Sequence, residues 1–313
     1  MISTTKSYPL ARAIGQLWSP NCFRNATRMA FIEHRLGTTH YTVKRKDPSL
    51  DPIIWLHGGP GGTHNPKGPV FSLATDRSVY AYTQLGSGRS SDLGKRRWRI
   101  STFVNELHEL IRAWGIESFH LMGGSWGTTL AVEYYLRHHG KGIQSLVLQS
   151  PMLSAADWQR DANRLIKGLP QETQTVIKGC QSLGATDAQV YQQALASYYA
   201  RHVLRRPKKL KAMLSRKNPR GAAIYRYMWG ESEFSATGTL KNYDTTANLK
   251  QITCPTLVVC GEHDEATPKT GKRYARALPQ GRFVEIEHAS HAIWEERPHS
   301  LRRAILGFLA SQD

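Results

Sequence analysis

The chain has 313 residues, enough to bury a full hydrophobic core, and its content of 40% apolar and 9% aromatic residues excludes a disordered chain. No apolar run approaches the roughly 18 residues of a membrane-spanning helix, and residues 1–21 lack the apolar centre of a secretory signal, so we expect a cytoplasmic protein without a membrane partner. The formal net charge of +18 raises the hypothesis of nucleic-acid binding.

Strand patterns and helix patterns alternate along the first 150 residues. The hydrophobic spacing predicts, in order, a hairpin over 29–46, strands over 52–58 and 78–86, a helix over 103–115, a strand over 118–124, a helix over 126–140 and a strand over 143–151. The strands after the hairpin are continuously apolar. Such strands are typical of a parallel sheet that helices cover on both faces.

A helical segment, residues 151–240, interrupts this alternation, with helices predicted over 155–169, 188–204 and 208–216. It contains the most basic part of the chain, residues 201–220, with nine Lys or Arg and no acidic residue. This part has no aromatic residues to stack on bases and matches no nucleic-acid-binding motif. We therefore interpret it as a solvated basic helical face and expect no nucleic-acid partner.

The alternation resumes after the helical segment. The pattern predicts a strand over 254–264, a helix over 268–278, a strand over 282–290 and a helix over 299–311. The sequence therefore predicts an α/β protein whose sheet domain is formed by residues 1–150 and 241–313, with residues 151–240 as a helical insertion.

The cysteines and histidines show no pattern of a disulfide framework or a metal site. Cys22, Cys180, Cys254 and Cys260 form no C-x-x-C pair, and the 13 histidines form no H-E-x-x-H motif. We expect no metal and no organic cofactor.

Ser125 stands between a predicted strand and a predicted helix, inside a G-x-S-x-G pattern formed with Gly123 and Gly127. At such a sharp turn the serine backbone is strained, and larger side chains two residues away would collide. The turn exposes the hydroxyl at a helix N-terminus, where free N–H groups favour negative charge. The pattern indicates a nucleophilic serine.

A nucleophilic serine needs a base to take its proton and an acid to orient that base. Asp264 follows one late predicted strand, and both His288 and His291 follow the next, which gives the chain order Ser, Asp, His. We assign Asp264 as the acid. We assign His291 as the base because His288 stands at the predicted strand end.

Residues 57–62, His-Gly-Gly-Pro-Gly-Gly, follow an early predicted strand. A loop of this kind either cradles a phosphate or brings backbone N–H groups to an oxyanion. No Lys-Ser/Thr follows, which disfavours a phosphate loop. An acyl transfer needs two N–H donors, and we assign one to Trp126 and the other to Gly59, with Gly58 as the alternative.

Six motifs occur in a recognisable order between about residues 50 and 300: HGGPGG.H, QLGSGRS, GGSWGTTLA, MWGESEF, CGEHDEATP and SHAIWEE. On these motifs the chain resembles the proline iminopeptidases (prolyl aminopeptidases) of the α/β-hydrolase superfamily. The resemblance implies a mostly parallel central sheet flanked by helices, with a helical cap inserted after the sixth strand. It carries the family's catalytic residues onto Ser125, Asp264 and His291, which also favours His291 over His288.

The resemblance further implies a serine hydrolase that releases an N-terminal residue, proline or a small apolar one, from short peptides or amino-acid amides through an acyl-enzyme. The acids that hold the free amine in the family correspond to Glu233 and Glu265. An ammonium that enters a partly closed pocket loses water and needs nearby carboxylates. In the alternative interpretation, Glu233 is a solvated cap residue and Glu265 pairs with a lysine or arginine.

Thr83 departs from the family pattern, because the family usually reads YDQLGSGRS and this chain reads YTQLGSGRS. The missing acid stands at a strand end near the 57–62 loop, so its loss bears on the support of that loop. Two alternatives stay open. One is the same triad acting on another acyl substrate, such as an amino-acid amide or ester, a lactone or a specialised peptide intermediate; the other is a binding protein on a hydrolase scaffold.

Overall fold

The computed structural model describes residues 27–215 and 218–312. Cys22 and the rest of the first 26 residues of the predicted segment 1–150 lie outside the described residues, as do Arg216 and Lys217 of the basic stretch. Within the described ranges, no helix combines the length and the apolar character needed to cross a membrane.

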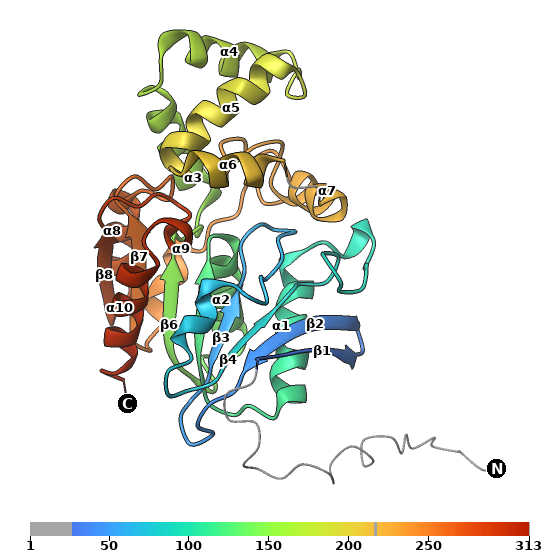
Figure 1. Ribbon diagram of the computed structural model, residues 1–313, viewed down its shortest axis with the longest axis vertical. Helices are drawn as coiled ribbons and strands as arrows, with labels where there is room; N and C mark the ends of the chain where they lie inside the picture. Colours follow the sequence, from blue (N-terminus) through green and yellow to red (C-terminus); the bar gives the residue numbers. More distant parts are fainter. Residues whose placement is uncertain (1–26, 216–217, 313) are drawn as a thin grey trace, which may run out of the picture.

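The described residues form an eight-stranded sheet with the strand order β1-β2-β4-β3-β5-β6-β7-β8 (Figure 1). The first two neighbouring pairs, β1 with β2 and β2 with β4, are antiparallel, and the other five are parallel. The strands are β1 (Thr27–His34), β2 (Gly37–Lys44), β3 (Ile53–Leu56), β4 (Val79–Tyr82), β5 (Phe119–Gly124), β6 (Ile143–Gln149), β7 (Thr256–Gly261) and β8 (Gly281–Ile286). The expectation of a mostly parallel sheet is confirmed.

The central strands are apolar throughout because both of their faces are covered. All six residues of β5 and all six of β7 are buried. In β3, Ile54 and Leu56 join the core on one side of the sheet and Ile53 joins the core on the other. Since β3 and β5 to β8 run parallel, the residues that follow these strands meet at one edge of the sheet.

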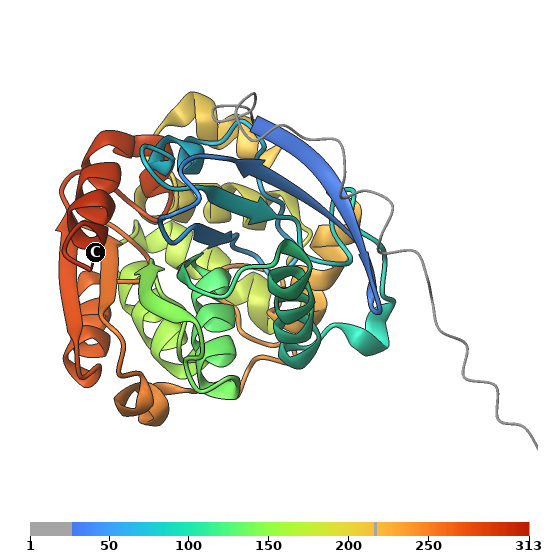
Figure 2. The same cartoon turned by 90° about the horizontal axis from the view of Figure 1, so that it is seen from below.

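Helices cover both faces of the sheet (Figure 2). One face packs against α1 (Ile100–Trp114), α2 (Trp126–Arg137) and α8 (Pro268–Ala277). The other packs against α10 (Pro298–Leu309) and the 3-10 helix η1 (Pro69–Leu73). The remaining short helices outside the insertion are η2 (Lys95–Arg97), η3 (Thr246–Gln251) and α9 (Ile293–Glu296).

Between β6 and β7 the described chain forms five α-helices, which sit together at one end of the sheet as a cap, before the 3-10 helix η3 (Figure 1). They are α3 (Ala155–Ile166), α4 (Gln171–Ser182), α5 (Gln189–His202), α6 (Pro207–Leu214) and α7 (Pro219–Met228). The first three share a buried cluster of their own. The predicted insertion after the sixth strand is therefore present.

Two of the cap helices, α4 and α7, were not predicted from the sequence. Helix α4 buries only Ile177, so it lacks the apolar stripe by which a helix is recognised. Helix α7 buries only Gly221, Ile224 and Met228, and its start is set by a local signal, the Asn218 side chain accepting a hydrogen bond from the Gly221 N–H.

Candidate active site

Ser125 lies at the turn between β5 and α2, with φ of 53° and ψ of −123°. This left-handed backbone is rare for a residue with a side chain and marks local strain. The flanking glycines are required by close backbone approach: a Cβ at Gly123 would lie 2.3 Å from the Gly127 oxygen, and one at Gly127 would lie 2.2 Å from the Leu56 oxygen. The turn thus presents the serine at the carboxyl edge of the sheet.

The 57–62 loop follows β3 and lies directly against this turn. A Cβ at Gly58 would stand 3.3 Å from the Ser125 Cβ. Gly59 has φ of 129°, and a Cβ there would lie 2.6 Å from the Gly62 nitrogen. Glycines therefore let the loop fold tightly beside the serine, in the place where an oxyanion donor is expected.

Two buried side chains that the sequence analysis did not single out support this loop. The Gln84 N–H donates to His57 Nε2 at 3.0 Å, so Nδ1 carries the proton and donates to the Gly58 oxygen at 2.7 Å. Burial lowers the pKa of His57 to about 4, which keeps the ring neutral. The Gln84 side chain also accepts a hydrogen bond from Trp126 Nε1 at 2.9 Å, so one residue ties the loop to the start of α2.

Asp264 and His291 meet at the ends of β7 and β8. His291 Nδ1 and Asp264 Oδ1 are 2.8 Å apart, and the Asp264 carboxyl also accepts hydrogen bonds from the Ala266 N–H and the Ser150 hydroxyl, the latter at 2.6 Å. Asp264 is buried. Ser150, directly after β6, is a further residue of this site that the sequence analysis missed.

The other histidine of this region lies elsewhere. Strand β8 ends at Ile286, so His288 stands in the following turn with φ of 55°. Its side chain is 68% exposed, and its Nδ1 faces Glu262 at 3.6 Å. The geometry therefore pairs His291, and not His288, with Asp264.

Glu265 and Glu233 bring two further carboxyl groups beside His291. Glu265 is buried, its Oε1 lies 4.0 Å from His291 Nδ1, and the hydroxyl of Tyr198 interacts with its carboxyl group. The alternative in which Glu265 pairs with a lysine or arginine is wrong for this structure. Glu233 is half-buried, and its main-chain oxygen accepts hydrogen bonds from the indoles of Trp158 and Trp229.

The electrostatics of these groups are linked. Burial and the nearby Glu233 raise the pKa of Glu265 well above its usual range, and burial raises the pKa of Glu233. Burial disfavours the charged form of His291, but Asp264, Glu265 and Glu233 together raise its pKa to about 9. The site thus gathers three carboxyl groups around one imidazole and is prepared for a positive charge.

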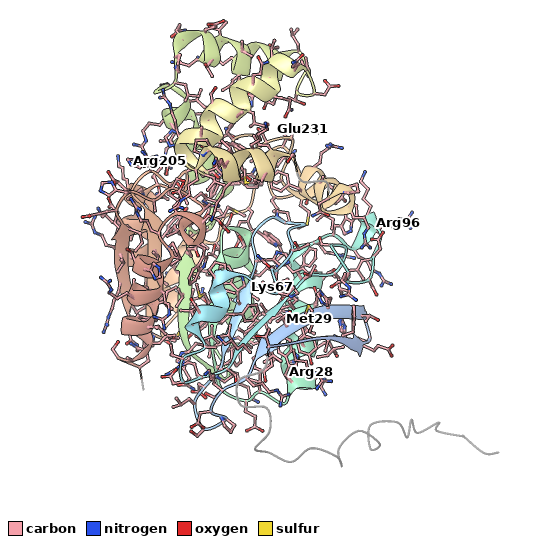
Figure 3. All side chains as sticks on the ribbon, in the orientation of Figure 1. Arg28, Met29, Lys67, Arg96, Arg205 and Glu231 are labelled. Atoms are coloured by element: carbon pink, nitrogen blue, oxygen red, sulfur yellow. The ribbon has the colours of Figure 1, made fainter. Side chains whose placement is uncertain are left out.

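The cap backbone holds the loop that carries His291. The His291 N–H donates to the His202 oxygen at 3.1 Å, and the Ala292 N–H donates to the Val203 oxygen at 2.8 Å. Glu296, which is buried, accepts hydrogen bonds from the Ser290 N–H at 2.6 Å and from the Arg205 N–H. Figure 3 labels Arg205 at this boundary between cap and core.

The cap also touches the 57–62 loop, through α7. A Cβ at Gly61 would lie 2.2 Å from the Gly221 oxygen, so only glycine allows this approach. The Asn218 side-chain amide donates to the Gly61 oxygen at 3.1 Å. The cap therefore contacts both the loop that carries His291 and the 57–62 loop beside Ser125.

The basic stretch 201–220 is only partly the solvated face that the sequence predicts. Arg206 donates to the Glu296 oxygen, Lys209 pairs with Glu295 at 2.5 Å, and Arg220 donates to the Gly88 oxygen. These basic side chains join the cap to the core, because their partners follow β4 and β8 in the sheet domain.

The comparisons with known proteins agree with this geometry. The family described as alpha/beta hydrolase fold matches residues 51–298. The proline iminopeptidase of Heyndrickxia coagulans is 40% identical over 284 residues, which cover 90% of this chain and 98% of that protein. The chain belongs to the proline iminopeptidase family of α/β hydrolases.

Solved structures extend the likeness. The crystal structure of the proline iminopeptidase of Mycobacterium smegmatis has a TM-score of 0.81 and 32% identity, covering 92% of this chain and 98% of that one. The crystal structure of VinJ has a TM-score of 0.84 and 30% identity, and the match covers 91% of this chain and 99% of that one. The predicted fold class and family are confirmed.

Thr83, the departure from the proline iminopeptidase pattern, is buried at the end of β4 and contacts His64 of the HGGPGG.H motif. Its Oγ1 lies 2.7 Å from His64 Nδ1, and Thr42 Oγ1 lies 2.9 Å from Nε2. Burial, with the nearby His57 and His40, lowers the pKa of His64 to about 3. In this chain, hydroxyl groups thus hold a neutral imidazole where the family pattern provides an acid.

Replacing Thr83 by aspartate is expected to raise the pKa of His64 towards or above the ordinary value of about 6.5, because a carboxylate in contact favours the imidazolium. The measurement is a pH titration of the histidine side-chain NMR signals, with Thr83→Ser as the control that keeps the hydroxyl. A His64 that stays neutral to pH 5 in Thr83→Asp would contradict the expectation.

Among the described residues, no group of three or more His, Cys, Asp or Glu side chains is arranged to hold a metal ion.

Proposed function

We propose that this member of the family is a serine aminopeptidase that releases an N-terminal proline, or a small apolar residue, from short peptides or amides. The observation that carries the proposal is the pair of glutamates beside His291. Glu265 is buried, no lysine or arginine of the described structure pairs with it, and Glu233 interacts electrostatically with the same imidazole. An ionised carboxyl group in such a pocket is stabilised by a cation, and a free α-ammonium is one.

In the proposed mechanism, Ser125 attacks the acyl carbon while His291 Nε2 takes the hydroxyl proton. Asp264 accepts the hydrogen bond from Nδ1 and so keeps Nε2 directed at the serine. The N–H groups of Gly59 and Trp126 stabilise the oxyanion. His291 then gives its proton to the leaving amine, and a water molecule activated by the same histidine hydrolyses the acyl-enzyme.

The glutamates explain why a chain terminus is preferred. A continuing peptide chain brings an uncharged amide to Glu233 and Glu265, and it leaves their desolvated carboxyl groups without a cation. A terminal ammonium satisfies both of them. Its positive charge also offsets the effect of the two glutamates on His291, which lowers the pKa of His291 and provides the neutral base that the serine needs at neutral pH.

Replacing Glu233 or Glu265 by glutamine is expected to lower kcat/KM for proline and alanine arylamides by about 30-fold or more, because a buried charge pair with the substrate is lost. Hydrolysis of the N-acetylated arylamides is expected to change little. The matched control is Glu231→Gln, since Glu231 lies in the same cap segment, exposed and paired with Arg226.

Two results would contradict the assignment. One is an unchanged preference for free-amine substrates when both glutamates are replaced. The other is hydrolysis of simple acyl esters by the wild type far above that of every free-amine substrate, which would favour the same triad acting on another acyl group.

We also propose a cytoplasmic location, which is supported by the chemistry of the thiols. Cys180, Cys254 and Cys260 form no disulfide with one another in the described part of the chain, and burial raises the pKa of Cys254 to about 11 and that of Cys260 well above its usual value. Unpaired thiols of low reactivity suit a reducing compartment.

A further inference from the structure

A cavity that contains none of the predicted catalytic residues lies at the seam between the cap and the sheet domain. It has a volume of about 400 Å³ and is lined by residues of α3 and of α8. The lining residues are Arg160, Asp161, Arg164, Lys269, Thr270, Arg273 and Arg276. Helix α3 belongs to the cap and α8 to the core, so a molecule in this cavity would touch both parts of the protein.

The cavity has a strong excess of positive charge. Five of its seven lining residues are Lys or Arg and one is acidic. A second acid, Asp157, lies next to it and pairs with Arg160 and Arg273. Five positive charges against these two acids leave an excess of three. Repulsion among cations gathered on one concave surface favours the binding of an anion with several charges.

The two acids, Asp157 and Asp161, hold other residues of the cavity wall in place. The Asp161 carboxyl is buried, and it accepts hydrogen bonds from the hydroxyls of Thr267, at 2.6 Å, and Thr270, at 2.5 Å. It faces Arg164 at 3.7 Å. An arginine whose guanidinium group is already held by a carboxylate, as Arg164 is here, loses less side-chain entropy on ligand binding than a free arginine.

The buried Asp157 anchors two more guanidinium groups, because it binds Arg160 at 2.5 Å and also binds Arg273. Lys269 and Arg276, by contrast, form no ion pair with any described residue and are exposed at the cavity. Three oriented arginines and two unpaired cations therefore surround the same space.

We propose that this cavity binds a small anion that carries at least two phosphate groups. Planar guanidinium groups match phosphate oxygens in a bidentate manner, and a single phosphate carries too little charge to offset the excess of three. The bound anion would connect α3 to α8 and so fasten the cap to the core. This site contains none of the groups assigned to the peptidase reaction, so it does not rest on the proposed function.

The test is isothermal titration of the full-length protein with pyrophosphate, triphosphate and ADP at constant ionic strength, with sulfate as the reference anion. We expect saturable binding at one site, tighter for each phosphate compound than for sulfate, and a rise in Tm with ligand concentration. Binding of ADP well above pyrophosphate would identify a nucleotide as the source of the phosphates, and equal binding would identify the free polyphosphate.

Matched variants distinguish binding in this cavity from non-specific attraction of anions to a basic protein. Lys269→Ala/Arg276→Ala is expected to weaken pyrophosphate binding by about 10-fold or more. The control, Lys178→Ala/Lys241→Ala, removes two exposed charges elsewhere and is expected to leave binding unchanged. Equal weakening in both double variants, no saturable binding by any of the three compounds, or tighter binding of an oligoglutamate peptide than of pyrophosphate would each overturn the proposal.

Discussion

Replacing Ser125 by alanine is expected to lower kcat/KM for a proline arylamide by about 10⁴-fold or more and to leave the fold intact. The reason is that the hydroxyl is the only group at the strained turn that can form the acyl-enzyme, whereas the glycines around it set the backbone. The measurement is steady-state kinetics, with circular dichroism to verify folding.

A covalent probe makes this test independent of the substrate. A fluorophosphonate is expected to add one label to the peptide that contains Ser125 in the wild type and none in Ser125→Ala, as read by mass spectrometry. Ser182→Ala, on the exposed end of α4, serves as the control. A Ser125→Ala protein that keeps wild-type hydrolysis would disprove the serine-hydrolase mechanism.

Replacing Glu296 by alanine is expected to lower both stability and activity. Its carboxyl group accepts hydrogen bonds from the N–H groups of Ser290 and Arg205, and removing it leaves these donors without their partner. We expect the free energy of unfolding to fall by about 3 kcal/mol. We expect kcat to fall by about 100-fold at a temperature where the variant is folded, because the loop that carries His291 is no longer fixed.

Glu295→Ala is the matched control for Glu296. Glu295 is the adjacent residue, but it is exposed and paired with Lys209, so its loss is expected to cost less than about 1 kcal/mol. The proton on His291 Nδ1, in its 2.8 Å hydrogen bond with Asp264, gives a separate NMR signature that is expected to shift or broaden only in Glu296→Ala. Wild-type kcat together with an unchanged proton signal would show that Glu296 does not position His291.

The sequence predicts best those features that backbone geometry demands. Several glycines around Ser125 and in the 57–62 loop stand where a side chain would collide with backbone atoms. These positions therefore require glycine, and the glycine spacing can be recognised in the sequence. The continuously apolar strands likewise follow from burial on both faces of the sheet. Residues such as Asp264 and His291 were found because each follows a recognisable strand.

Other parts of the site have no such local pattern. Gln84 and Ser150 act through a few hydrogen bonds made across the fold, and either residue type is common in a loop. The contact of His202 with His291 joins residues 89 positions apart in the chain through main-chain atoms, which any sequence could supply. Only the folded arrangement shows that the cap contacts the edge of the sheet where Ser125, Asp264 and His291 lie.

The contacts between the cap and the loop of His291 mean that a movement of the cap would affect both access to the site and the position of the proposed base. If the cap swung away as one body, it would break the hydrogen bonds from His291 and Ala292 to His202 and Val203, and the loop that carries His291 would lose two of its main-chain supports. Opening of the cap would therefore expose the carboxyl edge of the sheet and loosen the loop of the proposed base in one movement.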